Sequence, residues 1–333
     1  MERFIAIDNM CAWPNLKRLA NGELIVFAFN KPGHGTFEGE VECWAGTDGG
    51  RLWAPRGVPS PHEPGSNRMN LAAGLSPSGA VLALVSGWAN PTKPVAERYV
   101  IPTRVCRSED NGASWSQAET FPVPEGEKAV IPFGDVLALP GGRLAVTAYS
   151  WNPPVNSSWI YFSEDDGRTW GNPSLIGGNT FNETVAFRLE NGHLIAAART
   201  MISQEGRPDA DQHLELFIND DLGASWRQVG PLTLNGQIPG ALTRLQDGRL
   251  LLTYGVRCYG FYGVACRFGS PDASGWSRPY YLVNCDGAGD GGYPSSVQLD
   301  DGTIVTAYYA NKDRDHHRYH MGVVRWKLEE VGG

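Results

Sequence analysis

The sequence predicts an all-β fold, namely a six-bladed β-propeller with four antiparallel strands in each blade. Two short phrases recur along the chain, one of them six times and the other five times. The 333 residues also include 41 glycines and 23 prolines, a composition that suits many tight turns and few long helices. Because the repeats run through nearly the whole chain, residues 1–333 are expected to form a single domain.

The first phrase consists of an apolar run, a turn containing glycine, and a second run in which apolar and polar residues alternate. FGDVLALPGGRLAVTAY and PGALTRLQDGRLLLTYG are two of its six copies. Period-two alternation on both sides of an Asn-Gly, Asp-Gly or Gly-Gly turn predicts a β-hairpin. The turn glycines recur every 50 to 63 residues, at Gly22, Gly79, Gly142, Gly192, Gly248 and Gly302.

The second phrase lies between copies of the first and ends in tryptophan. Its clearest copies read SEDNGASW and SEDDGRTW, and its tryptophans are Trp53, Trp115, Trp170, Trp226 and Trp276. The Asp and Ser or Thr side chains can bond the turn backbone, and the indole offers a large apolar plate for packing. Each copy therefore predicts a second hairpin. Two hairpins make a four-stranded repeat, and six such repeats predict a propeller, in which radial packing protects the strand edges.

The charge and the apolar runs limit the partners and the location that we expect. A net charge of -8 and a pI near 5.4 argue against a nucleic-acid partner, because such binding depends on clustered Lys and Arg. The sequence has neither a signal-peptide pattern nor eighteen consecutive apolar residues, so we expect a soluble protein without a membrane span. The compartment stays open between the cytoplasm and a secreted or periplasmic location with the signal removed.

Three sets of residues resemble metal or disulfide sites but lack the required spacing. The six cysteines form no CxxC pair, and buried free thiols are expected rather than zinc ligands or a Cys258–Cys266 disulfide. DGAGDGG at 286–292 lacks calcium-loop spacing and is expected to be a mobile loop. DRDHHRYH at 313–320 has no paired ligands on a regular element and is expected to be a polar wall of the site. No metal and no cofactor is therefore expected.

If the strands of each blade run outward in order, the short stereotyped turns share one face and the longer loops share the other. Binding residues are expected on that second face, which holds the loops at 30–40, 87–103, 150–158, 200–213, 257–263 and 309–319. Counting nine residues back from each turn glycine reaches the start of each innermost strand. The resulting ring consists of Trp13, Asn70, Phe133, Glu183, Pro239 and Tyr293. Glu183 and Tyr293 thus occupy equivalent positions two blades apart and can converge on one ligand.

The second phrases resemble the Asp-boxes of the sialidase (neuraminidase) superfamily of BNR-repeat propellers, in which these turns lie away from the site. NETVAFRLENGHLIAAAR resembles the glutamate blade of that family, and YPSSVQLDDGTIVTAYY resembles its nucleophile blade. The resemblance implies that Tyr293 is the nucleophile and that Glu183 deprotonates it. It also implies that Arg199 and Arg257 grip a sugar carboxylate through paired hydrogen bonds, which arginine forms and lysine does not.

The chain departs from the family pattern at the first triplet. The family opens with Arg-Ile-Pro or Arg-Tyr-Pro, whereas this chain has Ala12-Trp13-Pro14 at the matching place. One arginine of the expected triad is therefore absent. Arg68, on the adjacent blade, is a candidate to reach the vacant position, and a plain surface arginine is the alternative.

The second departure concerns the proton donor. The family keeps an aspartate in the first long loop, but the corresponding FNKPGHGTFEGEVEC contains none. His34 lies nearest to the required spacing and Glu38 is next; histidine ordinarily titrates near pH 6.5, which suits a proton donor. Asp135, near the start of the third blade, is a third candidate for this role, and with Trp13 and Asn70 it is expected to border the substrate.

These residues lead to three functional hypotheses. The first is a sialidase-like exo-glycosidase that hydrolyses the glycosidic bond of a terminal acidic sugar, sialic acid or a related one, so that the partner is a glycan. The second is a propeller lyase of uronate-containing glycans, with Tyr293 or His34 moving the proton. The third is a carbohydrate-binding propeller without catalysis, which the absent aspartate favours.

Overall fold

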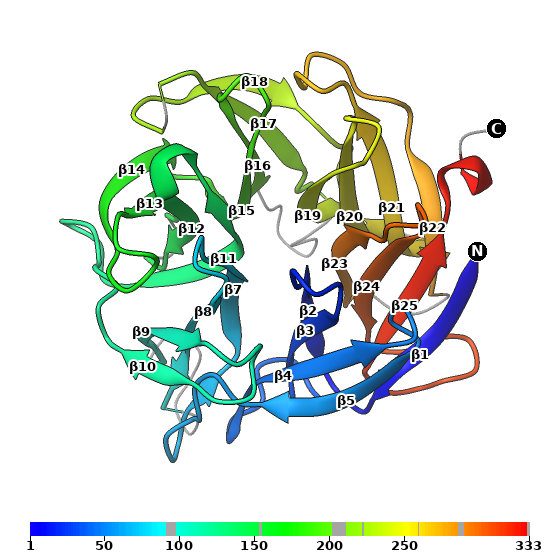
Figure 1. Ribbon diagram of the computed structural model, residues 1–333, viewed down its shortest axis with the longest axis horizontal. Helices are drawn as coiled ribbons and strands as arrows, with labels where there is room; N and C mark the ends of the chain where they lie inside the picture. Colours follow the sequence, from blue (N-terminus) through cyan, green and yellow to red (C-terminus); the bar gives the residue numbers. More distant parts are fainter. Residues whose placement is uncertain are drawn as a thin grey trace.

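The computed structural model describes residues 1–90, 98–152, 155–201, 211–221, 223–258, 260–285 and 290–331, which form β-strands and short 3₁₀ turns. Figure 1 shows the sheets arranged in a ring around a common centre, with β1 and β25 side by side. Within this part of the chain, no helix has the length and hydrophobicity that a membrane crossing demands. The predicted all-β class is confirmed. Some residues of the predicted loops, at 91–97, 153–154, 202–210 and 259, lie outside the described residues.

The strands of the first half of the chain form three antiparallel meanders of four strands each. The first contains β2 (Ala12–Arg18), β3 (Leu24–Phe29), β4 (Gly39–Thr47) and β5 (Leu52–Gly57). The second contains β7 (Asn70–Leu75), β8 (Val81–Ala89), β9 (Tyr99–Ser108) and β10 (Ser116–Ala118). The third contains β11 (Val130–Ala138), β12 (Leu144–Ser150), β13 (Ser158–Ser163) and β14 (Gly171–Gly177). The short β6 (Asn67–Arg68) pairs in parallel with β4.

The second half of the chain continues the pattern. A fourth meander contains β15 (Phe181–Arg188), β16 (Leu194–Thr200), β17 (Leu214–Asn219) and β18 (Arg227–Pro231). A fifth contains β19 (Gln237–Arg244), β20 (Leu250–Cys258), β21 (Phe261–Gly269) and β22 (Tyr280–Asn284). In the last sheet, β1 (Glu2–Asp8) pairs with β25 (His320–Trp326), which follows β24 (Ile304–Ala310) and β23 (Gly291–Gln298). Two 3₁₀ turns span Pro140–Gly142 and Leu328–Glu330.

Hydrogen bonding joins the second and third meanders, because β7 and β11 pair in parallel over three residues. The described residues therefore form five hydrogen-bonded sheets, one of them eight-stranded. The antiparallel four-stranded pattern agrees with the sequence, while the number of separate blades stays a prediction.

The six turn glycines lie where the first phrase placed them, between the first and second strands of each meander. All six have positive φ, between 80° and 91°. Glycine adopts this conformation without the steric cost that a Cβ atom adds. Gly22 illustrates the turn, since its N–H donates to Leu19 O at 2.9 Å.

The tryptophan phrases form the turns between the third and fourth strands. In SEDDGRTW, Thr169 N donates to Asp165 Oδ1 at 2.9 Å and Gly167 N donates to Ser163 Oγ at 3.0 Å. The same bonds recur in SEDNGASW. The Trp115 ring lies 5.9 Å from that of Phe27 in the neighbouring sheet, so the indole packs between sheets as the sequence predicted. These turns stabilise the fold and lie away from the centre of the ring.

The hydrophobic core lies between neighbouring sheets. Ile195 of β16 and Leu252 of β20 belong to one buried cluster, and Val26 of β3 and Val323 of β25 belong to another. Cys11, Cys43, Cys106 and Cys266 are buried free thiols, as the sequence predicts, whereas Cys258 is only partly buried.

A register shift interrupts most of the first strands close to their start. Such shifts occur in β2 (between Ala12 and Asn15), β11 (Phe133 and Leu137), β15 (Phe181 and Thr184), β19 (Gln237 and Gly240) and β23 (Gly292 and Ser295). A β-bulge bends a strand and turns a side chain to a new direction. Glu183 and Tyr293 each lie within such a shift, so an equal count from the turn glycine corresponds to an equivalent place in the fold.

Candidate active site

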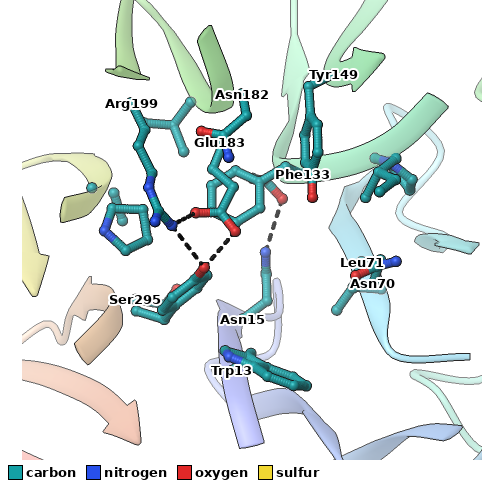
Figure 2. Close-up of a pocket in the computed structure, with 18 of the residues that line it drawn as sticks. Trp13, Asn15, Asn70, Leu71, Phe133, Tyr149, Asn182, Glu183, Arg199 and Ser295 are labelled. Atoms are coloured by element: carbon teal, nitrogen blue, oxygen red, sulfur yellow. Dashed lines mark hydrogen bonds and ion pairs between the residues drawn. The ribbon is translucent and has the colours of Figure 1, made fainter. Parts of the chain in front are cut away.

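A pocket of about 520 Å³ lies where the first strands of the meanders begin. It is lined by all six residues reached by counting back from the turn glycines: Trp13, Asn70, Phe133, Glu183, Pro239 and Tyr293. Figure 2 shows Glu183 and Arg199 together on one side of this pocket, with Asn70 and Leu71 across from them. The sequence count therefore locates the centre of the ring.

Tyr293, Glu183 and Arg199 are in mutual contact. The Tyr293 hydroxyl donates a short hydrogen bond to Glu183 Oε1. Arg199 Nη1 donates to Glu183 Oε2 and lies 3.2 Å from the Tyr293 oxygen. Arg199 Nε donates to Gln212 Oε1 at 2.8 Å, which fixes the guanidinium. A hydroxyl bonded to a carboxylate that is itself oriented by a third group is the arrangement that activates a nucleophile.

The backbone at two rim positions is strained. Tyr293 has φ 47° and Trp13 has φ 45°, values that aromatic residues rarely adopt. Each such residue costs about 1–3 kcal/mol and persists where its surroundings determine the conformation. Beside Tyr293, a Cβ atom on Gly292 would lie 2.6 Å from Gly255 Cα, so glycine allows β23 to approach β20 closely. The strained backbone of Tyr293 thus lies at the bulge in β23, and this bulge turns the Tyr293 ring into the pocket.

Burial raises the pKa of Tyr293 well above its ordinary value, and the charge of Glu183 raises it further. The charges of Arg199 and Arg257 lower the pKa of Tyr293, but not enough to reverse the increase. The phenol is therefore protonated at neutral pH and donates its hydrogen to Glu183.

Arg257 lies on the other side of the Tyr293 ring, with its guanidinium carbon 5.5 Å from the ring centre. Its Nε donates to Gly291 O at 3.1 Å, and its Nη2 lies 3.6 Å from Asp290 Oδ1. The side chain is 7% exposed. Two guanidinium groups thus flank the phenol, one beside Glu183 and the other beside Asp290.

Trp13 forms an aromatic border of the pocket. Its ring stacks on Phe29 at 5.4 Å and meets His34 edge-on at 4.9 Å. It also contacts the rings of Tyr293 and Tyr309. Ala12, at the place of the family's first arginine, is 1% exposed. At this place the pocket therefore has the aromatic surface of Trp13 and its neighbours, where the family has the positive charge of an arginine.

Asp290 is a pocket residue that the sequence reasoning missed as a functional candidate. Its Oδ2 lies 3.0 Å from His34 Nδ1 and accepts a hydrogen bond from the Tyr319 hydroxyl, while its Oδ1 accepts from Tyr309. Burial opposes ionisation, but the bonds from His34, Tyr309 and Tyr319 outweigh it and hold the pKa of Asp290 well below its ordinary value. The only sequence signal was an acidic residue three positions before Tyr293.

Two of the predicted site residues are engaged elsewhere. The Arg68 side chain is 2% exposed, pairs with Glu63 and donates to Pro102 O at 2.7 Å. Glu38 accepts from Gly65 N at 2.6 Å and lies 3.2 Å from His62 Nε2. Neither residue lines the pocket. Arg68 is held by Glu63 and does not occupy the position that the missing arginine leaves vacant.

The side of the pocket opposite Glu183 carries amides and one further carboxylate. Asn70 and Asp135 both line it, and Asp135 Oδ1 pairs with Lys17 Nζ at 2.7 Å. Asn15 Nδ2 donates to Gly134 O at 2.8 Å, which leaves Asn15 Oδ1 as an acceptor. Among the described residues, Asn15 Oδ1 and Asn70 Nδ2 are buried without a hydrogen-bond partner. Both residues line the pocket, so the two atoms are available to a ligand.

Among the described residues, Cys11, His34 and Asp290 offer metal-ligand atoms within 4.8 Å of one another. The Asp290 oxygens already accept from two phenols, and Arg257 stands beside them. A neighbouring guanidinium disfavours a cation. Burial also raises the pKa of the Cys11 thiol, so it stays protonated. The group is better described as a hydrogen-bonded network than as a metal centre.

The segments at 286–292 and 313–320 were predicted to be a mobile loop and a polar wall of the site. Residues 286–289 lie outside the described residues, so the predicted mobile loop has no structural account there. None of residues 313–320 lines the pocket. Within that segment, Tyr319 reaches the site through Asp290, whereas His316 Nε2 lies 2.7 Å from Asp8 Oδ1 at the surface.

Comparisons with known proteins agree with this fold. A family model described as BNR repeat-like domain matches residues 22–306. A solved protein of unknown function from Dyadobacter fermentans has a TM-score of 0.83 and 22% identity, covering 98% of this chain and 97% of that one. A Hadza microbial sialidase has a TM-score of 0.72 and 17% identity, with 97% and 67% covered. Trypanosoma rangeli sialidase has a TM-score of 0.71 and 15% identity, with 98% and 55% covered, so this chain spans about half of it. No curated protein matches.

Proposed function

This chain belongs to the BNR repeat-like domain family, and from that membership together with the pocket geometry we propose that it is a retaining exo-glycosidase of a terminal acidic sugar. Sialic acid and related sugars are the substrate class. The observation that carries the proposal is the Tyr293–Glu183 hydrogen bond, with Arg199 in contact with both groups. Sialidases share the fold, which supports a sugar as the ligand.

The proposed first step transfers the sugar to Tyr293. Glu183 takes the phenolic proton, the Tyr293 oxygen bonds to the anomeric carbon, and the bond to the leaving oxygen breaks. In the second step, water attacks the same carbon, the bond to Tyr293 breaks, and the phenol regains its proton from Glu183. Two displacements at one carbon retain its configuration.

The residue types fit an acidic sugar. A carboxylate on the anomeric carbon would repel an anionic nucleophile, whereas a neutral phenol activated during attack avoids that repulsion. Arg199 and Arg257 lie on both sides of the phenol and supply the positive charge that a sugar carboxylate needs. We propose that they form a two-arginine clamp in place of the family's three.

The proposal extends to the architecture. Each four-stranded meander is one blade of a six-bladed propeller, and residues 1–333 form one domain whose centre is the pocket. The bulged first strands support this view, because they bring equivalent positions of different meanders to one cavity.

Tyr293→Phe tests the proposal. We expect turnover of the 4-nitrophenyl glycosides of N-acetylneuraminic and glucuronic acids to fall by about 10³-fold or more, because the attacking oxygen is removed. Thermal-shift assays should show that binding of the free acidic sugar survives. Tyr281→Phe, an exposed tyrosine outside the pocket, is the matched control. Unchanged turnover in Tyr293→Phe, or an unsaturated product absorbing in the ultraviolet, would contradict a glycosidase.

A further inference from the structure

We infer that His34 and Asp290 form the proton-donating pair of this pocket, with His34 protonating the leaving oxygen and Asp290 holding the imidazole in position. The inference rests on the proposed function and supplies the proton donor that it leaves unassigned. His34 contacts the leaving group and is therefore a catalytic residue, whereas Asp290 acts through His34 and is a positioning residue.

The first observation is the place of His34. It lies in the connection between β3 and β4, lines the pocket, and rests against the edge of Trp13. Its side chain is 55% exposed, so a leaving group that points out of the pocket can reach it. Glu38, the other acid candidate in this connection, is bonded to Gly65 and His62 outside the pocket lining.

The second observation is the way Asp290 is fixed. The residue precedes β23. Its carboxylate accepts hydrogen bonds from Tyr309 of β24 and from Tyr319, which lies just before β25. Arg257 of β20 lies 3.6 Å from the same carboxylate. The Asp290 side chain is 21% exposed, in contrast to that of His34. A carboxylate bound from three directions cannot turn away, so it can orient a more mobile ring.

The third observation concerns the proton. An ionised carboxylate only accepts hydrogen bonds, so His34 Nδ1 carries the hydrogen that bonds Asp290 Oδ2. The remaining nitrogen, Nε2, has no hydrogen bond within the described part of the chain. Asp290 is bonded to His34, Cys11 Sγ lies within 4.8 Å of a ring nitrogen of His34, and Arg257, Tyr309 and Tyr319 contact Asp290. Because Asp290 holds Nδ1, a proton that His34 gives to the leaving oxygen comes from Nε2.

When Tyr293 bonds to the anomeric carbon, the electron pair of the breaking bond goes to the leaving oxygen, which takes the proton from His34 Nε2. The leaving group departs as a neutral alcohol, and His34 becomes neutral. In the second step, the attacking water gives its proton to His34 Nε2, which restores the imidazolium. No metal, oxidant or further reactant takes part.

The experiment compares two leaving groups. Purified His34→Asn and Asp290→Asn are assayed with the methyl and the 4-nitrophenyl glycosides of N-acetylneuraminic acid. Methoxide needs a proton to depart and nitrophenolate does not. We expect His34→Asn to lower kcat on the methyl glycoside by about 10²–10⁴-fold, the usual size of general acid catalysis. On the nitrophenyl glycoside it should give a burst of nitrophenol followed by slow turnover, because bond cleavage survives and water activation does not.

The two leaving groups also separate positioning by Asp290 from a role in folding. Asp290→Asn should lower kcat on the methyl glycoside more than kcat on the nitrophenyl glycoside, because the imidazole is no longer held toward the leaving oxygen. A loss of folded protein would lower both values equally. The matched controls are His316→Asn and Asp8→Asn, which alter a similar pair outside the pocket lining and should leave both assays unchanged.

The outcomes also distinguish the two proposals. Equal losses on both glycosides, in His34→Asn or in Asp290→Asn, would overturn the pair while leaving Tyr293 and Glu183 in their roles. Wild-type protein that hydrolyses neither glycoside would overturn the proposed function together with the inference that rests on it.

Discussion

The two sides of the pocket differ in how their polar groups are paired. We call one the charged side, which consists of Glu183, Arg199, Arg257 and Tyr293. We call the other the neutral side, where Asn15, Asn70, Trp88, Tyr149 and Trp151 lie with Asp135, whose charge Lys17 balances. On the charged side, the carboxylate, guanidinium and phenol bond to one another. On the neutral side, Asn15 Oδ1 and Asn70 Nδ2 have no hydrogen-bond partner among the described residues, and Trp88 and Trp151 meet edge-to-face at 4.8 Å.

This difference separates chemistry from recognition. Groups that are already oriented toward each other need no rearrangement when charge develops, which favours reaction on the charged side. An unpaired buried polar atom costs about 1–3 kcal/mol, a cost that a ligand hydroxyl or amide removes when it binds. Under the proposed function, the neutral side is where the uncharged part of the sugar gains affinity, with indole faces that suit its apolar surface.

The largest expected effect comes from removing the base on the charged side. Glu183→Gln should lower kcat by about 10²–10⁴-fold, because the amide cannot accept the phenolic proton. Steady-state kinetics with an aryl glycoside measures this loss. Glu190→Gln changes a carboxylate that pairs with Arg244 at the surface and serves as the control. A small effect of Glu183→Gln would mean that pairing on the charged side is structural.

The next effect is on stability. Arg199→Met should lower the free energy of unfolding by about 3–5 kcal/mol, because Glu183 would be left buried without its partner. Urea denaturation followed by tryptophan fluorescence measures it. The double variant with Glu183→Gln should regain part of the loss, since the unpaired charge disappears. Additive losses would show that the two residues are not coupled.

Both sides of the pocket contain buried phenols, which predict that the protein loses stability at alkaline pH. Burial raises the pKa of Tyr293 and of Tyr149 above the ordinary value. Below about pH 10, each phenol is protonated in both states and its contribution is complete. Above that, the unfolded chain loses protons that the folded chain keeps, so stability should fall by about 1.4 kcal/mol per pH unit for each phenol. Urea denaturation across this range measures the slope, which Tyr293→Phe and Tyr149→Phe should each flatten.

The smallest effect is expected on the neutral side. Asn70→Ala should raise KM by about tenfold and leave kcat nearly unchanged, because a single hydrogen bond to the sugar is lost. The melting temperature should not fall, since Asn70 Nδ2 has no hydrogen-bond partner in the described part of the chain. A drop in kcat at constant KM would mean that Asn70 takes part in the reaction, and would contradict the assignment of the reaction to the charged side alone.

Local patterns explain what the sequence could predict. The hairpins follow from alternation and from glycines that adopt positive φ at the predicted turns. Glu183 and Tyr293 could be placed because the count from turn to rim is the same in their two strands, bulges included. The sialidase resemblance also pointed to Arg199, which contacts both residues, while its predicted role toward a sugar carboxylate stays a prediction.

What could not be predicted depends on partners that are distant in the sequence. Asp290 lies in a glycine-rich segment without periodicity, and its partner His34 is more than two hundred residues away. The ion pair that occupies Arg68 involves Glu63, five residues earlier, but no periodic pattern signals that this charge is buried. Likewise, nothing in the sequence distinguishes the unpaired amide of Asn70 from a solvated one.

The pairing of β1 with β25 has a consequence for biosynthesis. Six residue pairs, from Glu2 with Arg325 to Asp8 with His320, join two strands that are more than three hundred residues apart in the sequence. Until β25 has been synthesised, the edge of β1 that pairs with it is exposed and could bind another chain. Contacts of such long sequence separation form slowly. Pairing of β1 with β25 is therefore expected to be a late and aggregation-sensitive event in folding.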